Sequence, residues 1–364
     1  MKRLFAGMTA ALLAVILVFS YPADAVSAQS AILLDCTTGR ILYDKQCDRK
    51  SLIASTTKIM TALLVCEQCN VLDRVRIPKE AVGIEGSSMY LQEGEILTIQ
   101  ELLYGLMLRS GNDAAVALAI YCGGTVEGFV HMMNDKARTL GLSGTHFANP
   151  NGLDAPDHYS TAKDLGMLTV YAMKNPVFAT TVSTKLVTVG DRLLKNHNKL
   201  LWQLEGADGV KTGFTRAAGR ILVSSACRNG RRLIAVTIND PNDWKDHIYL
   251  METGFSQYMI KSVVTNGEYL GEIEIAGGNR KSVELIAADD FSYSVAQGEE
   301  IQITLPDPGF VYAPVAAGQK AGMASVFLGE QFIGSIPLIY GETVEKNENS
   351  PPGFWERLFG GKLK

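Results

Sequence analysis

The chain has 364 residues, of which 47% are hydrophobic and 20% are charged. This apolar content excludes a disordered protein, and the length is enough for roughly two domains with at least one large core. The 34 Lys and Arg residues against 38 Asp and Glu give a formal net charge of −4. That balance argues against a nucleic-acid-binding protein, because neutralising phosphates needs a basic excess. A multi-pass membrane protein is also excluded, because the one long apolar run stands at the start of the chain.

Residues 1–28 are typical of an export signal. Two basic residues precede an apolar run from Met8 to Phe19, and small residues follow it up to Ala28. The run is shorter than the roughly 20 residues that cross a bilayer, which favours a cleaved signal peptide over an uncleaved anchor. Cleavage could follow Ala25 or Ala28, and we therefore expect an exported protein.

A first domain is expected over residues 29–260. Hydrophobic periodicity and turn signals predict two hairpins, one of strands 30–35 and 40–43 and one of strands 221–227 and 233–238. Between them they predict a helix that opens at Ser55, a helical stretch 98–122 interrupted at 110–112, and a helix over 161–174. A helix over 250–258 ends the domain. Asn229 and Gly230 give the second hairpin a strong turn signal.

Beyond residue 260 the pattern changes to short β-branched runs separated by Gly, Pro and Asp turns. It predicts a small all-β domain of sandwich type over residues 261–343. A polar linker and a last segment occupy residues 344–364. In that segment Trp355, Leu358, Phe359 and Leu363 share one helical face, which favours a tail that lies in a membrane interface. A frayed terminus is the alternative, because two adjacent glycines weaken the helix.

Six cysteines are scattered along the chain: Cys36, Cys47, Cys66, Cys69, Cys122 and Cys227. Cys66 and Cys69 have C-x-x-C spacing, but no second pair completes a tetrahedral metal site. Two thiols near a helix end are favoured over a redox motif. Export makes pairing possible, and the spacing leaves the pairing open.

Three short motifs carry the chemistry. Ser55 and Lys58 form an S-x-x-K, which on a helix places the amine near the hydroxyl that it must deprotonate. A second match, Ser160 to Lys163, shows that this pattern alone is weak. Only the first is followed by Ser110-Gly111-Asn112 and then by Lys211-Thr212-Gly213. Such a set, in this order, is found in β-lactamases and penicillin-binding proteins.

The chain resembles the serine-type D-alanyl-D-alanine carboxypeptidases, the low-molecular-mass penicillin-binding proteins. The resemblance runs from about residue 30 to 340 and rests on the three motifs and on the stretches 53–63, 149–153, 158–165, 196–198 and 206–215. It implies an α+β fold: a β-lactamase/transpeptidase-like domain, with an antiparallel sheet flanked by helices and a helical subdomain, followed by the small β domain. It also implies a place at the outer face of the cytoplasmic membrane or in the cell wall space.

The resemblance also implies roles for the motif residues in the acylation step. Ser55 would attack the D-Ala-D-Ala carbonyl and form an acyl-enzyme, with Lys58 as its base. Ser110 would relay a proton to the leaving amine, and Asn112 would hold the substrate amide. Lys211 would keep the pKa of Lys58 low and attract the substrate carboxylate.

The K-T-G motif would complete the substrate site. Thr212 would add a hydroxyl toward the carboxylate, and Gly213 belongs to the same strand. The backbone N–H groups of Ser55 and Phe214 would hold the oxyanion. Phe214 stands where other members often have histidine, although only its backbone is needed.

The chain departs from the family in one substrate contact. The arginine that members often carry before the last helix of the domain is missing, and Lys245, Arg216 or Arg220 could replace it. The expected partners are peptidoglycan stem peptides that end in D-Ala-D-Ala, β-lactams as covalent inhibitors, and a membrane surface through the tail. No cofactor, metal or nucleic acid is expected.

Three other functions are less consistent with the sequence. A class A β-lactamase shares the motifs but deacylates through a glutamate, and no glutamate occurs between Gly128 and Leu204. A zinc peptidase is disfavoured because the histidines are scattered; a polar loop before a helix capped by Ser160 is the simpler interpretation of Asp154, Asp157 and His158. A non-catalytic wall-binding scaffold is disfavoured because every catalytic position is present.

Overall fold

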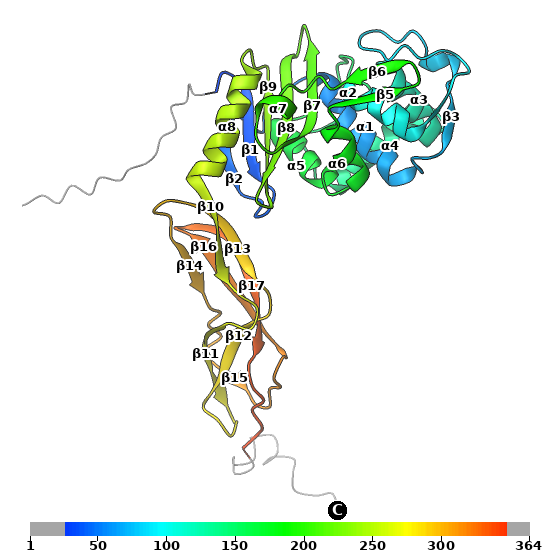
Figure 1. Cartoon of the computed structure of the whole chain (residues 1–364). Helices are drawn as coiled ribbons and strands as arrows, with labels where there is room; N and C mark the ends of the chain where they lie inside the picture. The colour runs from blue at the N-terminus through cyan, green and yellow to red at the C-terminus, as the bar shows by residue number, and fades with distance from the viewer. Residues whose placement is uncertain (1–25, 348–364) are drawn as a thin grey trace, which may run out of the picture.

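The computed structural model describes residues 26–347. Figure 1 shows a domain of mixed helices and strands, from which a narrower β domain extends. The first domain runs from β1 (Ser30–Asp35) to α8 (Asp243–Gln257), and the second from β10 (Tyr258–Val264) to β17 (Gln331–Tyr340). Most of the predicted signal peptide and most of the predicted tail lie outside the described residues.

A five-stranded sheet forms the centre of the first domain, in the order β2-β1-β9-β8-β7, with every neighbouring pair antiparallel. The strands not yet given are β2 (Ile41–Lys45), β7 (Ala207–Thr215), β8 (Gly219–Arg228) and β9 (Arg231–Ile238). The two predicted hairpins, β1 with β2 and β8 with β9, are confirmed. β7 is an edge strand, so one side of the strand that carries the K-T-G motif is left unpaired in the sheet.

The strand sequences bury both faces of this sheet. Along β1, Ile32 and Leu34 pack into the large helical core, whereas Ala31 and Leu33 pack against the α8 side. Alternation of side chains along a strand sends neighbours to opposite faces, so a fully apolar strand needs cover on both sides. In Figure 1, α8 covers one face and the helical part of the domain covers the other.

The helical part is inserted between β2 and β7. Its helices are α1 (Lys58–Gln68), α2 (Ile99–Leu108), α3 (Asn112–Gly123), α4 (Val126–Thr139), α5 (Ala162–Ala172), α6 (Pro176–Ser183) and the short α7 (Leu200–Gln203). It also contains two 3₁₀ turns, η1 (Ala54–Thr57) and η2 (Lys79–Ala81), and two small two-stranded sheets, β3 (Arg74–Arg76) with β4 (Ile96–Thr98) and β5 (Leu186–Val189) with β6 (Arg192–Lys195). The predicted break at 110–112 is confirmed, because α2 ends at Leu108 and α3 begins at Asn112.

Three predicted helix starts differ from the structure. Ser55 lies in η1, and the α-helix begins only at Lys58. Thr161, not Ser160, caps α5, because its side chain accepts a hydrogen bond from the Asp164 N–H. The helix predicted over 250–258 begins earlier, as α8. Its first turns are rich in polar residues that are nevertheless buried, which hid the apolar period from the sequence pattern.

The β domain has two sheets around one core. The six-stranded sheet has the order β14-β16-β17-β12-β11-β15, and β10 pairs with β13. The remaining strands are β11 (Tyr269–Ala276), β12 (Ser282–Ala287), β13 (Phe291–Ala296), β14 (Ile301–Thr304), β15 (Val311–Tyr312) and β16 (Lys320–Leu328). Val264 of β10 and Phe291 of β13 pack into the same apolar cluster as the larger sheet. This packing agrees with the predicted small β domain.

Buried and partly buried polar contacts join the two domains. Arg231 of β9 binds Asp35 through Nε at 2.7 Å, and both residues contact the Ser294 hydroxyl of β13 at 2.9 Å. Arg40 forms two bonds of 2.6 Å with Glu299 and lies over aromatic rings of the junction. Because an arginine fork fixes both distance and direction, these contacts orient the β domain against the sheet of the first domain.

The structure packs residues 26–28, which the sequence analysis assigned to the signal, against the first domain. Val26 and Ala28 are buried beside α8. The Ser27 hydroxyl contacts Asp240 and Asp246 at 2.7 Å, and its N–H donates to Asp246. Cleavage after Ala25 keeps these contacts in the mature chain, whereas cleavage after Ala28 removes them.

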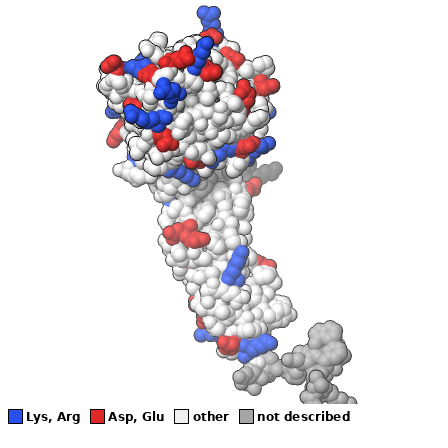
Figure 2. All heavy atoms as spheres, turned by 90° about the vertical axis from the view of Figure 1, so that its right-hand side faces the viewer, with Lys and Arg blue, Asp and Glu red and all other residues white. Residues whose placement is uncertain are grey.

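Figure 2 shows basic and acidic residues interspersed over the first domain and few charges over the β domain on that face. Among residues 26–347, no single helix is long and apolar enough to cross a membrane, although α3 and α4 pass that test as a pair bent by 83°.

Candidate active site

A cavity of about 350 Å³ opens beside the end of β7. Five of the predicted site residues line it: Ser55, Ser110, Thr212, Gly213 and Phe214. The other three, Lys58, Asn112 and Lys211, are buried. Hydrogen bonds connect Lys58 both to Ser55 and to Asn112. The structure therefore brings residues from all three motifs together at one place.

The first motif is held in a tight turn. Ser55 lies in η1, directly after Ala54, whose φ of 44° is in the left-handed region. The turn is stabilised by the Thr57 hydroxyl, which donates to the Ala54 carbonyl at 2.8 Å. Lys58 follows as the first residue of α1. The hydroxyl of Ser55 consequently faces the cavity while the amine of Lys58 stays inside the protein.

Lys58 is completely buried and makes three hydrogen bonds. Its Nζ atom donates to Ser55 Oγ at 3.0 Å, to Asn112 Oδ1 at 2.7 Å and to the carbonyl of Asn151. Burial holds the pKa of this amine well below its usual value, and the positive charge of Lys211 lowers it further. A lysine with such a lowered pKa loses its proton more easily, and the neutral amine then has a lone pair in place of one of the three donated bonds, with which it can accept a proton.

Lys211 supplies a second buried amine. It is 1% exposed, and its Nζ donates to the carbonyl of Thr212 at 2.9 Å. Burial lowers the pKa of Lys211 to about 7. The amine therefore exchanges its proton near neutral pH, and an anionic ligand would stabilise the charged form.

Gly213 lets β7 approach the turn of Ser55. A Cβ atom on Gly213 would lie 3.3 Å from the Ile53 oxygen and equally close to the backbone nitrogens of Ser55 and Thr56. That spacing is tighter than side chains usually accept, so a glycine suits this position. The unpaired edge of β7 thus borders the backbone nitrogen of Ser55.

Asn112 is fixed by the chain segment that precedes β4. Its N–H donates to the Ser87 carbonyl at 2.7 Å, and its Nδ2 donates to the Glu85 carbonyl at 2.5 Å. Gly86 between them leaves no room for a side chain, because a Cβ there would lie 2.8 Å from Asn112 Nδ2. Both ends of the Asn112 amide are therefore occupied, one by Lys58 and one by this segment.

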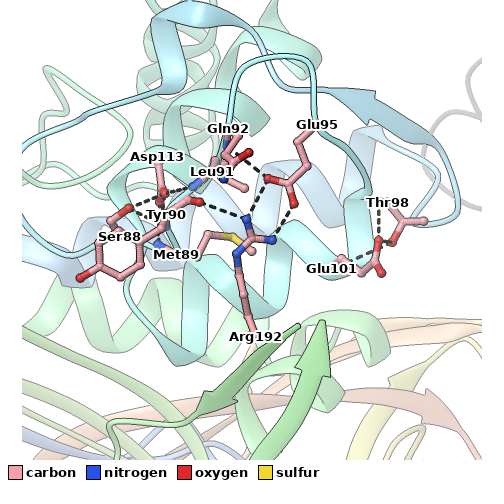
Figure 3. A network of polar contacts seen from close by, with 10 residues as sticks. All are labelled: Ser88, Met89, Tyr90, Leu91, Gln92, Glu95, Thr98, Glu101, Asp113 and Arg192. Carbon is pink, nitrogen blue, oxygen red and sulfur yellow. Dashed lines mark hydrogen bonds and ion pairs between the residues drawn. The ribbon is translucent and has the colours of Figure 1, made fainter. Parts of the chain in front are cut away.

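A polar network holds the same segment in place (Figure 3). The Asp113 carboxylate accepts from Ser88 Oγ and from the backbone N–H groups of Met89 and Leu91. Arg192 of β6 forms a two-bond pair with Glu95, at 2.6 and 2.9 Å, and also donates to the Tyr90 carbonyl. Thr98 and Glu101 cap α2 reciprocally at the end of the segment. The network holds Ser88 to Leu91, the residues that directly follow the cavity-lining Ser87.

His158 is a structural partner of the turn that the sequence analysis did not assign. Its Nδ1 accepts from the Ala148 N–H at 3.0 Å, so its Nε2 carries the proton that reaches Thr57 Oγ1 at 2.6 Å. Burial lowers the pKa of His158 to about 4, which keeps the ring neutral. The sequence signal was its place in a family-like stretch, but nothing in the spacing indicated the contact with Thr57.

The structure distinguishes among the three basic residues that could bind a substrate carboxylate. Arg220 of β8 lines the cavity, whereas Lys245 and Arg216 are not among its lining residues. Two nitrogens of Arg220 contact Asp243 at 2.8 to 3.1 Å, and its guanidinium lies over the Trp244 ring. Lys199, which the sequence analysis did not consider, also lines the cavity.

The second S-x-x-K match has a different environment. Ser160 shares a hydrogen bond of 2.7 Å with Thr145, and the Lys163 amine lies 3.2 Å from Asp48 with its side chain 43% exposed. A solvated, ion-paired lysine stays protonated and cannot act as a base. Within residues 26–347, no group of three or more His, Cys, Asp or Glu side chains has the arrangement of a metal site.

Comparisons with known proteins agree with this geometry. A family model described as D-alanyl-D-alanine carboxypeptidase matches residues 18–242, and one described as penicillin-binding protein 5, C-terminal domain, matches residues 258–346. The chain belongs to the D-alanyl-D-alanine carboxypeptidase family. This family of serine hydrolases has a β-lactamase/transpeptidase-like fold, so the predicted family, enzyme class and fold are confirmed.

Relatives of known name cover most of the chain. D-alanyl-D-alanine carboxypeptidase DacF of Bacillus subtilis is 31% identical over 88% of this chain and 86% of its own length. DacC of Escherichia coli is 32% identical over 93% and 88%. Among solved structures, penicillin-binding protein 5 of Haemophilus influenzae superposes with a TM-score of 0.77 at 30% identity, covering 88% of this chain and 98% of that one.

Proposed function

We propose that this protein is an exported serine D,D-carboxypeptidase that removes the terminal D-alanine from peptidoglycan stem pentapeptides through an acyl-enzyme. The observation that carries the proposal is the hydrogen bond of 3.0 Å between the Ser55 hydroxyl and the buried amine of Lys58. Family membership supports the reaction, and the geometry supports the assignment of its steps to residues.

Acylation begins when neutral Lys58 takes the proton of Ser55. The Ser55 oxygen then attacks the carbonyl carbon of the D-Ala-D-Ala bond and forms a tetrahedral oxyanion. The backbone nitrogen of Ser55, beside the edge of β7, and that of Phe214 serve as the donors for this oxyanion. Burial and Lys211 lower the pKa of Lys58, which suits this amine to act as the base.

The leaving D-alanine needs a proton on its nitrogen. Ser110 lines the same cavity as Ser55, and it passes a proton that originates on Lys58 to this nitrogen as the C–N bond breaks. Asn112 binds Lys58 and the Glu85 carbonyl in the described structure, so it must release one of these partners for its amide to hold the substrate amide. Water then hydrolyses the ester and restores Ser55.

The terminal carboxylate of the substrate is recognised by cations near β7. Lys211 carries the charge that a carboxylate stabilises, and Thr212 adds a hydroxyl. Arg220 takes the place of the arginine that family members carry elsewhere, because it lines the cavity on the strand next to β7. An ion pair with Asp243 at 2.8 Å holds its guanidinium in place.

Penicillin should acylate Ser55, and the resulting acyl-enzyme should be hydrolysed slowly. Among the described residues that line the cavity, the acidic side chain is Asp243, which is paired with Arg220. It therefore is not available as the base that class A β-lactamases use to activate water. The protein should thus be inhibited by β-lactams instead of destroying them.

The test combines a label and a substrate. A fluorescent penicillin should label the protein stoichiometrically, and mass spectrometry should show a pentapeptide that ends in D-Ala-D-Ala losing one alanine. Both signals should disappear in Ser55→Ala and persist in Ser160→Ala, the matched control from the second S-x-x-K. Labelling of Ser55→Ala, or rapid release of hydrolysed penicillin, would overturn the proposal.

Export and membrane attachment form the second part of the proposal. The signal pattern of residues 1–28 supports export, and the apolar face of the tail supports attachment. Removing residues 353–364 should release the mature protein from the membrane fraction. If the shortened protein still sediments with membranes, the tail is not the anchor.

A further inference from the structure

Two cysteines that lie far apart in the sequence meet at one end of a helix pair. Cys69 is the C-cap residue of α1, and Cys122 lies in the last turn of α3. Their Sγ atoms are 2.9 Å apart, with Cys69 donating to Cys122. A disulfide needs about 2.05 Å between the sulfurs, so a small movement of either side chain is enough to form one.

The same two helices also meet at their other end. Lys58 begins α1 and Asn112 begins α3, and these residues share a hydrogen bond of 2.7 Å. α1 and α3 therefore run side by side, with catalytic residues at their N-terminal ends and the thiol pair at their C-terminal ends. A bond between the sulfurs would fix the helix pair opposite the active site.

The other cysteines show why this pair stands apart. Cys36 follows β1 and Cys227 lies on β8, and both flank Arg232 of the strand between them. Cys47 points to an aspartate, at 3.8 Å. A metal site is not an alternative at the pair, because no cluster of three ligands exists among residues 26–347.

We propose that Cys69 and Cys122 form a disulfide bond that braces α1 against α3 in the exported protein. The proposal rests on export, since disulfides persist in oxidising compartments. The oxidant is a disulfide, either of a thiol oxidoreductase or of a small thiol such as glutathione. The Cys122 thiolate attacks this disulfide and releases one thiol. The Cys69 sulfur then displaces the second thiol and forms the Cys69–Cys122 bond. Two protons and two electrons pass to the oxidant, which leaves as two thiols.

The local environment supports this order of attack. The hydrogen bond from Cys69 lowers the pKa of Cys122, and the same bond raises the pKa of Cys69. Because the thiolate is the nucleophile, Cys122 reacts first. Both residues are partly exposed, so a small disulfide can reach them.

The first experiment maps the bond in the full chain. Free thiols are blocked with N-ethylmaleimide before the exported protein is purified, and peptides are analysed without reduction. We expect a cross-linked peptide pair containing Cys69 and Cys122 and a mass lower than the dithiol by about 2 Da, the two hydrogens lost. Alkylation of both residues in the exported protein would overturn the disulfide in the cell.

The second experiment does not depend on export. The purified, reduced protein is incubated with glutathione disulfide, and its melting temperature is followed. Oxidation should raise it by roughly 5–10 °C, because the bond closes a long loop of the unfolded chain. Cys69→Ser and Cys122→Ser should lose this response, and Cys66→Ser, a neighbour on the same helix, should keep it. If oxidation does not raise the melting temperature of the wild type, the two cysteines do not form a disulfide that stabilises the helix pair.

These outcomes are separate from the test of the proposed function. Fluorescent penicillin should label Cys69→Ser and Cys122→Ser at 25 °C, since neither residue belongs to the catalytic machinery. A protein that is not labelled but forms the bond would refute the carboxypeptidase assignment alone. A labelled protein whose two thiols resist oxidation would refute the disulfide alone.

Discussion

Lys58 and Asn112 are joined by a hydrogen bond of 2.7 Å, although 53 residues stand between them. Each residue begins a helix, and the two helices lie side by side, so the contact fixes where the Lys58 amine points. From that position the amine also reaches Ser55 Oγ at 3.0 Å. Ser55, Lys58 and Asn112, the proposed nucleophile, its proposed base and a residue of the second motif, are thus one hydrogen-bonded unit, and the following predictions test its parts.

Replacing the base should stop acylation. Lys58→Arg keeps a positive charge but cannot give a neutral base near pH 7, so the rate of penicillin acylation should fall by about 10³-fold. Stopped-flow labelling measures the rate. Lys58→Met has a side chain of similar volume but no amine. If this variant folds and also loses acylation, the loss in Lys58→Arg does not come from misfolding.

Lys163→Arg is the matched control for this prediction. Lys163 belongs to the second S-x-x-K and pairs with Asp48 in solvent, so its replacement should leave the acylation rate within a factor of two. An equal loss in both variants would show that Lys58 acts through stability and not as a base.

The pH dependence should report the two buried amines. Lys58 must be neutral to act, so kcat/KM rises with pH as Lys58 loses its proton, far below the usual lysine range. Lys211 must be charged to bind the carboxylate, so kcat/KM falls as pH rises through about 7. The profile should be bell-shaped. In Lys211→Arg the falling limb should move to higher pH, since arginine keeps its proton; an unmoved limb would contradict the assignment.

Arg220 should set the affinity for the substrate carboxylate. Arg220→Ala should raise KM by about 10- to 100-fold with little change in kcat, because a charge-assisted hydrogen bond contributes about 1.5–3 kcal/mol. Arg216→Ala, on an exposed residue outside the cavity lining, is the control and should leave KM unchanged.

A substrate that ends in an amide distinguishes binding from folding in the same variant. Such a substrate has no carboxylate for Arg220 to bind, so Arg220→Ala should process it as well as the wild type does. A similar rise of KM for both substrates would mean that the loss comes from Asp243, left buried without its partner.

Gly152 should be essential for the turn that carries the nucleophile. Its φ is +89°, and a Cβ there would lie 1.9 Å from the Ala54 oxygen. Gly152→Ala should lower the acylation rate more than tenfold and lower the melting temperature. Gly141→Ala is the control: its φ is +70°, but nothing lies within 4 Å, so it should cost only about 1–2 kcal/mol and leave the rate unchanged.

The sequence was sufficient to predict the three motifs of the candidate site, but not the residues that form hydrogen bonds with them. That Ser55, Lys58 and Lys211 lie close together could be predicted, because they stand in recognisable short patterns. Glu85 binds Asn112 through its backbone carbonyl, which any residue could supply, so no side-chain pattern marks it. Arg220 could not be separated from Lys245, because that choice depends on how β8 lies beside β7.

Prediction of the fold from the sequence has the same limit: local patterns are recognised, but long-range contacts are not. The hairpins of β1 with β2 and β8 with β9 carry strong turn and strand patterns, and they were predicted closely. The beginning of α8 was missed because Asp243 and Asp246 look like surface residues, yet Arg220 and Ser27 satisfy them in the interior. Buried charge that is paired over a long distance in sequence leaves no local trace.

The free rim of β7 has a consequence for selectivity. A peptide that extends along this rim would join the sheet as one more strand and would be held by main-chain groups that every residue offers. Main-chain pairing of this kind depends on the chirality and the extended conformation of the ligand's backbone more than on its side chains. We therefore expect stem peptides of differing composition to be trimmed at comparable rates, while a stereochemical inversion next to the scissile bond would abolish turnover.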